Sequence, residues 1–176
     1  MPDTPAVLIS ADDIGHRVAQ IARAIRADAP DDVHFVAVLK GAFMFLGDLV
    51  RRLTGPVSVD FVALSSYAKG TTTSGEVRLL KDLDVPLDGR HVVIVEDIVD
   101  TGLTLTYLQD ILRARNPRSL RTACLLSKPS RRRTPVSVDY VGFEIDDVFV
   151  VGYGLDYEGQ YRNLPYIGTL PITAAL

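Results

Sequence analysis

Two spacings of apolar residues alternate along this chain of 176 residues. Between residues 10 and 27, isoleucine and valine recur every three or four positions, which predicts a helix with one buried face. Its start, Ser10-Ala-Asp-Asp13, resembles a helix cap with aspartate in place of the usual glutamate or glutamine. Residues 33–39 form instead an almost unbroken apolar run of strand length, which is typical of a strand covered on both faces.

The same alternation continues along the rest of the chain. Further helices are expected at residues 43–53 and 104–115, and further strands at residues 57–63, 77–80, 92–97, 122–126, 138–145 and 148–152. Strands that alternate with helices predict an α/β fold, a mainly parallel twisted sheet flanked by helices. The irregular, tyrosine-rich C-terminal part and the N-terminal end are expected to form a small hood. We expect residues 1–176 to form a single domain.

Polar groups gather at the end of one predicted strand. The apolar run 92–95 leads into Glu96 and Asp97, and the turn Asp100-Thr-Gly-Leu-Thr104 precedes the next predicted helix. A helix start with glycine and threonine offers backbone N–H groups and the positive end of the helix dipole, which suits a phosphate. Neighbouring carboxylates suit a ribose diol or a hydrated Mg²⁺. The stretch therefore fits a phosphorylated ribose, although a solvated strand end followed by a helix cap is the simpler alternative.

Composition and charge narrow the class of protein. The formal net charge of −3 argues against general affinity for nucleic acid. No apolar run approaches the roughly 20 residues that span a bilayer, and no signal peptide is visible, so a cytoplasmic location and no membrane partner are expected. The single cysteine, Cys124, lies in an apolar run and is expected to be a buried thiol in a reducing compartment.

Residues 92–104 resemble the phosphoribosyl-pyrophosphate (PRPP) motif of the type I phosphoribosyltransferases at every defining position. From about residue 33 to 168 the chain is also similar to the bacterial hypoxanthine-guanine phosphoribosyltransferases, in segments 38–45, 65–67, 81–84, 141–145 and 149–157. The resemblance implies the type I phosphoribosyltransferase fold. It also implies transfer of the 5-phosphoribosyl group from PRPP to hypoxanthine or guanine. The products would be IMP or GMP together with pyrophosphate. The cofactor would be Mg²⁺, and the protein would assemble as a homodimer or homotetramer.

The resemblance also implies roles at the PRPP motif. Asp100 would be the general base that takes the proton from purine N7. Glu96 and Asp97 would hold the ribose hydroxyls, directly or through Mg²⁺. The ribose 5-phosphate would meet Thr101, Gly102, Leu103 and Thr104, and Leu103 stands where some relatives carry lysine.

Pyrophosphate and purine would be held by other segments, again as the resemblance implies. Pyrophosphate would contact the loop residues Lys40 and Gly41, where the Leu39–Lys40 peptide bond can be cis, and also Arg162, Ser66 and Tyr67. On the purine side, the candidates are Lys128 as donor to the 6-oxo group, Phe149 as stacking partner, Val150 through its backbone, and Asp156 near the 2-position and a second Mg²⁺. Glu96, Asp97 and Asp156 are thus the candidate metal residues.

Several alternatives remain open from the sequence. Taken singly, Lys40-Gly41 could be an ordinary turn, Lys128 a solvated side chain and Phe149 a core residue. The polar segment 65–76 is expected to be a lid over pyrophosphate. The run 131–133 of three arginines indicates a solvated turn rather than a nucleic-acid patch. The base could also be xanthine, or the protein could be a non-catalytic, nucleotide-sensing regulator of the same fold.

Overall fold

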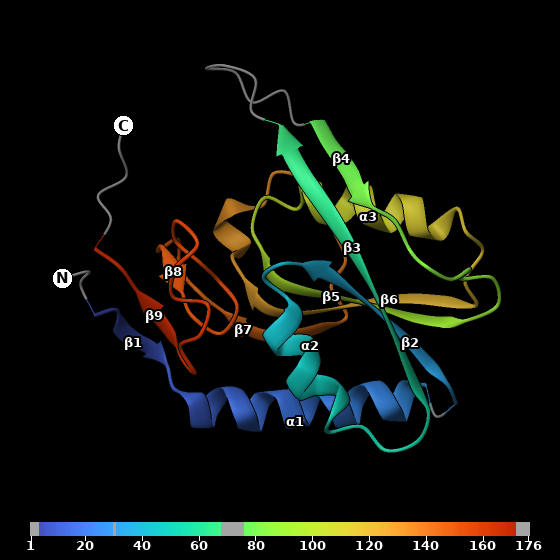
Figure 1. Cartoon of the computed structure of the whole chain (residues 1–176), viewed down its shortest axis with the longest axis horizontal. Coiled ribbons are helices and arrows are strands. Elements are labelled where there is room, and N and C mark those ends of the chain that lie inside the picture. The colour runs from blue at the N-terminus through green and yellow to red at the C-terminus, as the bar shows by residue number, and fades with distance from the viewer. Residues whose placement is uncertain (1–3, 30, 68–75, 172–176) are drawn as a thin grey trace.

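A six-stranded sheet forms the centre of the molecule in the computed structural model, which describes residues 4–29, 31–67 and 76–171 (Figure 1). In spatial order the strands are β4 (Glu76–Lys81), β3 (Val57–Tyr67), β2 (Val33–Leu39), β5 (His91–Val99), β6 (Ser119–Ser127) and β7 (Tyr140–Glu144). Neighbouring strands run parallel except for the antiparallel pair β3 and β4. The prediction of a mainly parallel α/β sheet is confirmed.

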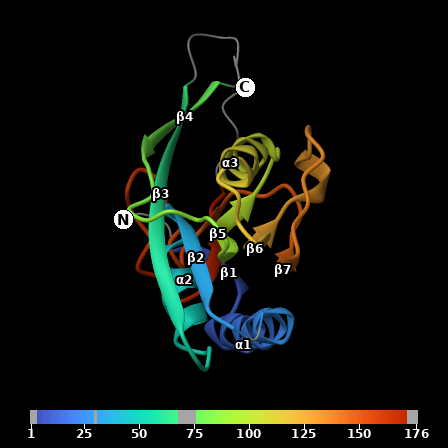
Figure 2. The same cartoon turned by 90° about the vertical axis from the view of Figure 1, so that its right-hand side faces the viewer.

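Helices cover both faces of this sheet (Figure 2). The helices α1 (Ala11–Asp28) and α2 (Phe43–Val50) pack on one face, and α3 (Leu103–Arg113) packs on the other. The predicted cap of α1 is present, because the Asp13 backbone N–H donates to the Ser10 hydroxyl at 3.1 Å. The amphipathic spacing in α1 buries its isoleucine and valine stripe in the core shared with β2.

The middle strands are buried on both sides, as their apolar runs predicted. β2 is buried along almost its whole length, and β5 is buried from Val92 to Glu96. Cys124 in β6 is fully buried beside Glu96 of β5, and burial raises the pKa of its thiol to about 12. The prediction that this cysteine is a core thiol is confirmed.

A separate three-stranded antiparallel sheet forms the hood at one side of the molecule (Figure 1). It joins β1 (Ala6–Ile9), β9 (Ile167–Thr169) and β8 (Val150–Val151), so both ends of the described chain contribute. A short 3₁₀ turn, η1 (Pro129–Arg131), follows β6 and lies near this side. The hood was expected, but the sequence pattern did not predict β1 as a strand.

Most element boundaries differ from the predicted ones by one to a few residues, and three of these differences concern β3, β5 and α2. β3 continues to Tyr67 because it pairs with β4, so the expected lid begins within a strand. β5 continues to Val99, so Glu96 and Asp97 lie inside the strand rather than at its end. The helix α2 ends at Val50, three residues early.

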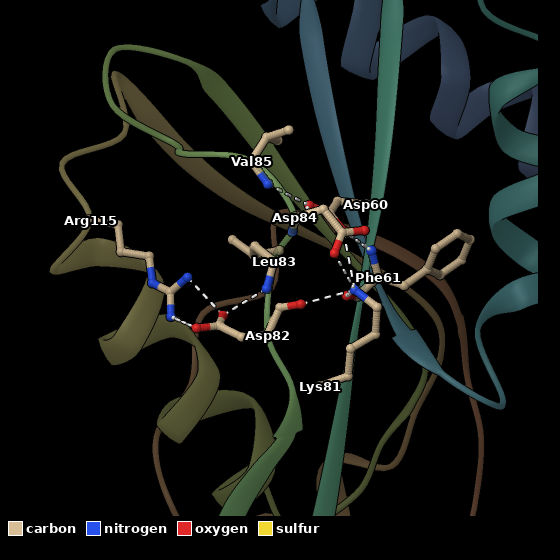
Figure 3. Close-up of polar contacts among 8 residues, drawn as sticks. All are labelled: Asp60, Phe61, Lys81, Asp82, Leu83, Asp84, Val85 and Arg115. Carbon is tan, nitrogen blue, oxygen red and sulfur yellow. Dashed lines mark hydrogen bonds and ion pairs between the residues drawn. The ribbon is translucent and has the colours of Figure 1, made fainter.

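A buried carboxylate fixes the β3–β4 hairpin to the turn that follows it (Figure 3). Asp60 of β3 is 3% exposed and accepts the backbone N–H groups of Phe61, Asp84 and Val85, while Lys81 lies 3.6 Å away. Burial by itself would raise the pKa of Asp60, but these donors outweigh it and lower the pKa. The base of the hairpin is therefore held by an ionised group.

Within the described part of the chain, no helix is long and apolar enough to cross a membrane.

Candidate active site

The candidate site lies at the edge where the parallel strands β2, β5 and β6 end. Parallel strands in register bring their carboxyl ends to one edge, which is where α/β sheets bind ligands. Lys40 follows β2, the 100–104 loop follows β5 and Lys128 follows β6. The Lys128 backbone N–H donates to the Val99 carbonyl at 3.0 Å, which joins the ends of β5 and β6.

The acidic pair is the most desolvated part of the site. Glu96 is 6% exposed, and burial, together with the Asp97 charge, raises its pKa well above the ordinary value. Burial also raises the pKa of Asp97 to about 6, although its carboxylate accepts the Ile98 backbone N–H at 2.8 Å. A buried and a half-buried carboxylate without a full counter-charge favour a hydrogen-bond donor or a cation. A ribose diol or Mg²⁺ supplies what the pair lacks.

The start of α3 forms a hollow of about 190 Å³ lined by residues 96–102, Thr104 and Leu105. Gly102 caps the helix with φ of 88°, and a Cβ there would lie 2.7 Å from the Thr134 carbonyl, so the position requires glycine. The first turn of a helix leaves backbone N–H groups without intrahelical partners, and Thr104 and Leu105 of this turn line the hollow. Leu103 is 38% exposed and adds no charge. Backbone amides and threonine hydroxyls are thus the groups offered to a phosphate.

The loop after β2 packs directly against the acidic pair. The Leu39–Lys40 peptide bond is cis, and Lys40 is exposed. A Cβ on Gly41 would lie 1.5 Å from Oδ2 of Asp97, so the carboxylate occupies the space that any side chain at position 41 would need. The candidate pyrophosphate loop and the candidate ribose clamp therefore touch.

The hood brings a cation and a carboxylate to the same side. Arg162 donates to the Gly154 carbonyl and forms an ion pair with Asp156, both at 2.6 Å. The backbone of Gly154 lies against the Gly41 carbonyl. The charge of Arg162 favours the ionised form of Asp97, and the charge of Asp156 disfavours it, so the predicted residues from the tail act on the ribose side.

The groups predicted to read a purine lie between η1 and the hood. Lys128 is buried, with 8% of its surface exposed, and its ammonium lies 3.4 Å from Asp147. Phe149 is 41% exposed and meets Tyr157 edge to face, so its ring is a platform rather than a core residue. Val150 is buried in β8. The alternative of a solvated Lys128 is wrong, because the side chain is buried and paired.

Asp100 has partners that the sequence did not indicate. Its carboxylate accepts from Arg131 Nε at 3.0 Å, and its carbonyl accepts from Arg132 at 2.5 Å. Arg132 also donates to the Ser127 hydroxyl. The run 131–133 was interpreted as a solvated turn, and Arg131 is indeed exposed, yet the side chains of Arg131 and Arg132 both hold the loop of the candidate base. Asp147 was missed as well.

Two parts of the prediction stand apart from this geometry. Ser66 and Tyr67 end β3, but residues 68–75, which make up most of the expected lid, lie outside the described residues. Among the residues that are described, no three histidine, cysteine, aspartate or glutamate side chains converge to hold a metal ion by themselves. Glu96, Asp97 and Asp156 thus do not form a complete ligand set of their own.

Comparison with known proteins decides the family. The model of the phosphoribosyl transferase domain matches residues 10–158. The chain belongs to the phosphoribosyltransferase family. Among curated relatives of this phosphoribosyltransferase, hypoxanthine phosphoribosyltransferase of Haemophilus influenzae is 50% identical over 166 residues, 92% of this chain and 93% of the relative. Hypoxanthine-guanine phosphoribosyltransferase of Bacillus subtilis is 45% identical over 169 residues, 96% and 94% of the two chains.

Solved structures agree with that assignment. A hypoxanthine-guanine phosphoribosyltransferase from Bacillus anthracis, with a HEPES molecule in its active site, superposes with a TM-score of 0.91 at 43% identity, covering 96% of this chain and 99% of its own. The type I phosphoribosyltransferase fold that the sequence predicted is therefore confirmed.

Proposed function

We propose that this phosphoribosyltransferase is a purine-salvage enzyme that transfers the 5-phosphoribosyl group of PRPP to hypoxanthine or guanine. The products are IMP or GMP and pyrophosphate. The observation that carries the proposal is the meeting, at one sheet edge, of the acidic pair Glu96 and Asp97, the open start of α3, and the buried donor Lys128. The names of relatives at 45–50% identity support the same activity.

The residues divide the reaction among them. Glu96 and Asp97 bind the ribose hydroxyls, and the amides and hydroxyls of residues 101–104 bind the 5-phosphate. The bond from ribose C1 to pyrophosphate breaks, a bond from C1 to a purine ring nitrogen forms, and Asp100 accepts the proton from N7. Lys40 with the Gly41 amide, Arg162, Ser66 and Tyr67 hold the leaving pyrophosphate.

Recognition of the base follows from the chemistry of the ammonium group. Lys128 can only donate hydrogen bonds, so it selects a 6-oxo group and disfavours the 6-amino group of adenine. Phe149 offers its exposed ring for stacking. The backbone of Val150 would contact the base edge, and Asp156 would read the 2-position.

Mg²⁺ fits the acidic pair. Glu96 is buried and Asp97 is half-buried, and the pKa values of both carboxylates are raised, so a divalent cation there would favour their ionised forms. The described side chains include no complete metal cage, so oxygen atoms of PRPP would complete the coordination at Glu96 and Asp97, and Asp156 is the candidate residue for a second site. When bound, Mg²⁺ supplies positive charge that stabilises the departing pyrophosphate.

The test is an assay of pyrophosphate release with PRPP and Mg²⁺ and with each of hypoxanthine, guanine, xanthine and adenine. Turnover of hypoxanthine or guanine, and none of adenine, is the expected result. A preference for xanthine would support the alternative base choice. Binding of PRPP without turnover of any base would favour a nucleotide-sensing regulator.

The assembly, the domain count and the location belong to the same proposal. Residues 1–176 form one domain that acts in the cytoplasm as a homo-oligomer, a dimer or a tetramer. Exposed apolar side chains on α2, β3 and β4 support association, namely Phe43, Val59 and Leu80, which are 39%, 41% and 69% exposed. Light scattering of the purified protein, compared with Leu80→Glu, tests this: the variant should be the smaller species.

A further inference from the structure

Four charged side chains alternate in sign across the edge where the purine is proposed to bind. Nε of Arg131 lies 3.0 Å from Oδ1 of Asp100, and the same guanidinium reaches Oδ2 of Asp147 at 3.4 Å. Oδ1 of Asp147 in turn lies 3.4 Å from the ammonium of Lys128. The order Asp100, Arg131, Asp147 and Lys128 thus connects the proposed base to the proposed 6-oxo donor through two residues that have no assigned role.

These contacts leave the two outer groups free to act. Arg131 engages one carboxylate oxygen of Asp100, so the other remains for a ligand. Lys128 has three N–H donors and gives one to Asp147. The two inner groups differ, because both carboxylate oxygens of Asp147 are engaged and Arg131 spans two acids. A planar guanidinium can bridge two carboxylates in fixed directions, which a lysine cannot.

Backbone contacts give three of the four charged residues, Lys128, Arg131 and Asp100, a common frame. Lys128 begins the η1 turn, and the Arg131 N–H donates to the Lys128 carbonyl at 3.1 Å, so these two residues move as one turn. Arg132, the next residue, donates to the Asp100 carbonyl and ties that turn to the loop after β5. The contact between Arg131 and Asp100 therefore spans two segments whose backbones are already joined.

We propose that Arg131 and Asp147 are positioning residues, in which Arg131 orients the Asp100 carboxylate and Asp147 orients the Lys128 ammonium for the 6-oxopurine. The assignment rests on the proposed function. Arg131, Asp100 and Asp147 are 42%, 40% and 50% exposed in their side chains, and ion pairs this exposed contribute little to stability. Their value lies in geometry, since a small displacement of a reacting group is costly to rate. The Asp100 hydrogen bond, followed by the charges of Asp100 and Asp147, raises the pKa of Arg131, so the guanidinium stays charged.

The experiment compares Arg131→Met, Asp147→Asn and the double variant with the matched control Arg133→Met. The control removes the same charge two residues away, from an exposed side chain outside the four-charge series. Arg131→Met should lower kcat about tenfold and leave the KM for PRPP within about twofold of the wild-type value, because only the general base, Asp100, loses its orientation. Asp147→Asn should raise the KM for hypoxanthine about fivefold, because Lys128 is no longer held.

The same set of variants also tests the coupling between Arg131 and Asp147 and the stability of the fold. The double variant should lose less than the product of the single losses, since both changes break one connected series. Arg131→Lys should recover part of the kcat, because lysine keeps the positive charge but lacks the planar guanidinium that can bridge two carboxylates. All variants should melt within about 4 °C of the wild type, as expected for exposed ion pairs.

The outcomes separate this assignment from the function on which it rests. If the wild type turns over hypoxanthine and Arg131→Met behaves like Arg133→Met, the positioning role is wrong and the proposed function stands. A loss in Arg131→Met that appears equally in the KM for PRPP and in thermal stability would show a structural role and would also overturn it. If the wild type itself turns over no 6-oxopurine, both proposals fail together.

Discussion

The contact between Gly41 and Asp97 predicts a large effect from a single methyl group. In Gly41→Ala the new Cβ would lie 1.5 Å from Oδ2 of Asp97 and 2.5 Å from its Cγ. Since non-bonded heavy atoms sit about 3.5 Å apart, the carboxylate or the loop must move by about 2 Å. Misplacement of a reacting or binding group by about 1 Å can cost 10²-fold in rate. We therefore expect kcat/KM for PRPP to fall by about 10²-fold or more.

Gly47→Ala is the matched control for this substitution. Gly47 lies in α2, six residues along the chain, and a Cβ there would meet no heavy atom within 4 Å. Alanine is favoured over glycine inside a helix by about 1 kcal/mol, so this variant should keep wild-type kinetics and melt slightly higher. Steady-state kinetics with varied PRPP, together with thermal unfolding of both variants, give the comparison. Overpacking in Gly41→Ala should also cost about 1–3 kcal/mol of stability.

A double-mutant cycle identifies the clash as the cause. With Asp97→Ala already in place, the nearest remaining atom of residue 97 would be its Cβ, at 3.3 Å from the new methyl group. Adding Gly41→Ala to that background should therefore change kcat/KM little. Wild-type kcat/KM in Gly41→Ala would refute the reasoning outright. An equal loss in both backgrounds would trace the effect to the loop backbone rather than to the carboxylate.

Three further substitutions test other parts of the molecule. Asp100→Asn should lower kcat by roughly 10²–10⁴-fold with the KM for PRPP unchanged, and near-normal kcat for hypoxanthine would rule out its role as the base. Lys128→Ala should weaken hypoxanthine and guanine by about 1.5–3 kcal/mol without affecting the KM for PRPP; loss of PRPP affinity instead would assign it to the phosphate site. Asp60→Asn should reduce stability at pH 7 by about 1–3 kcal/mol in urea titrations, since it removes the charge that Lys81 and three backbone donors share. Because folding lowers the pKa of Asp60, its contribution to the free energy of unfolding is present above pH 3.8, the ordinary pKa, and is lost as the pH falls through the pKa of the folded state. The stabilities of Asp60→Asn and the wild type should therefore converge in acid. A difference in stability that stays constant with pH would contradict this reasoning.

The sequence predicted the fold, and it indicated a candidate ribose side of the site, because both depend on local patterns. Alternating apolar spacings mark the strands and helices, and the parallel order brings their ends to one edge. The segment 96–104 is contiguous, so its strand, loop and helix start carry the acidic pair together with the groups proposed to bind the phosphate. The predicted length of β3 was wrong because its pairing with β4, not periodicity, determines where the strand ends.

The features that the sequence missed depend on distant partners. Arg131 and Asp100 are 31 residues apart, and no local spacing marks them as a pair. The strand β1 has only four residues, too few to show a periodic pattern of apolar side chains. It becomes a strand because β9, from the other end of the chain, pairs with it. Asp60 alternates with apolar neighbours as an exposed strand residue would, yet backbone donors from the turn after β4 bury it.

The isolation of Cys124 in β6 has a practical consequence. The chain has one cysteine, it is fully inaccessible, and its pKa of about 12 leaves almost no thiolate at neutral pH. The folded protein therefore carries no thiol able to react with a disulfide reagent or a maleimide. A cysteine placed on the surface would be the only point of attachment for a dye or spin label. In the unaltered protein, labelling of Cys124 would occur only when the centre of the sheet opens, so its rate would measure that opening directly.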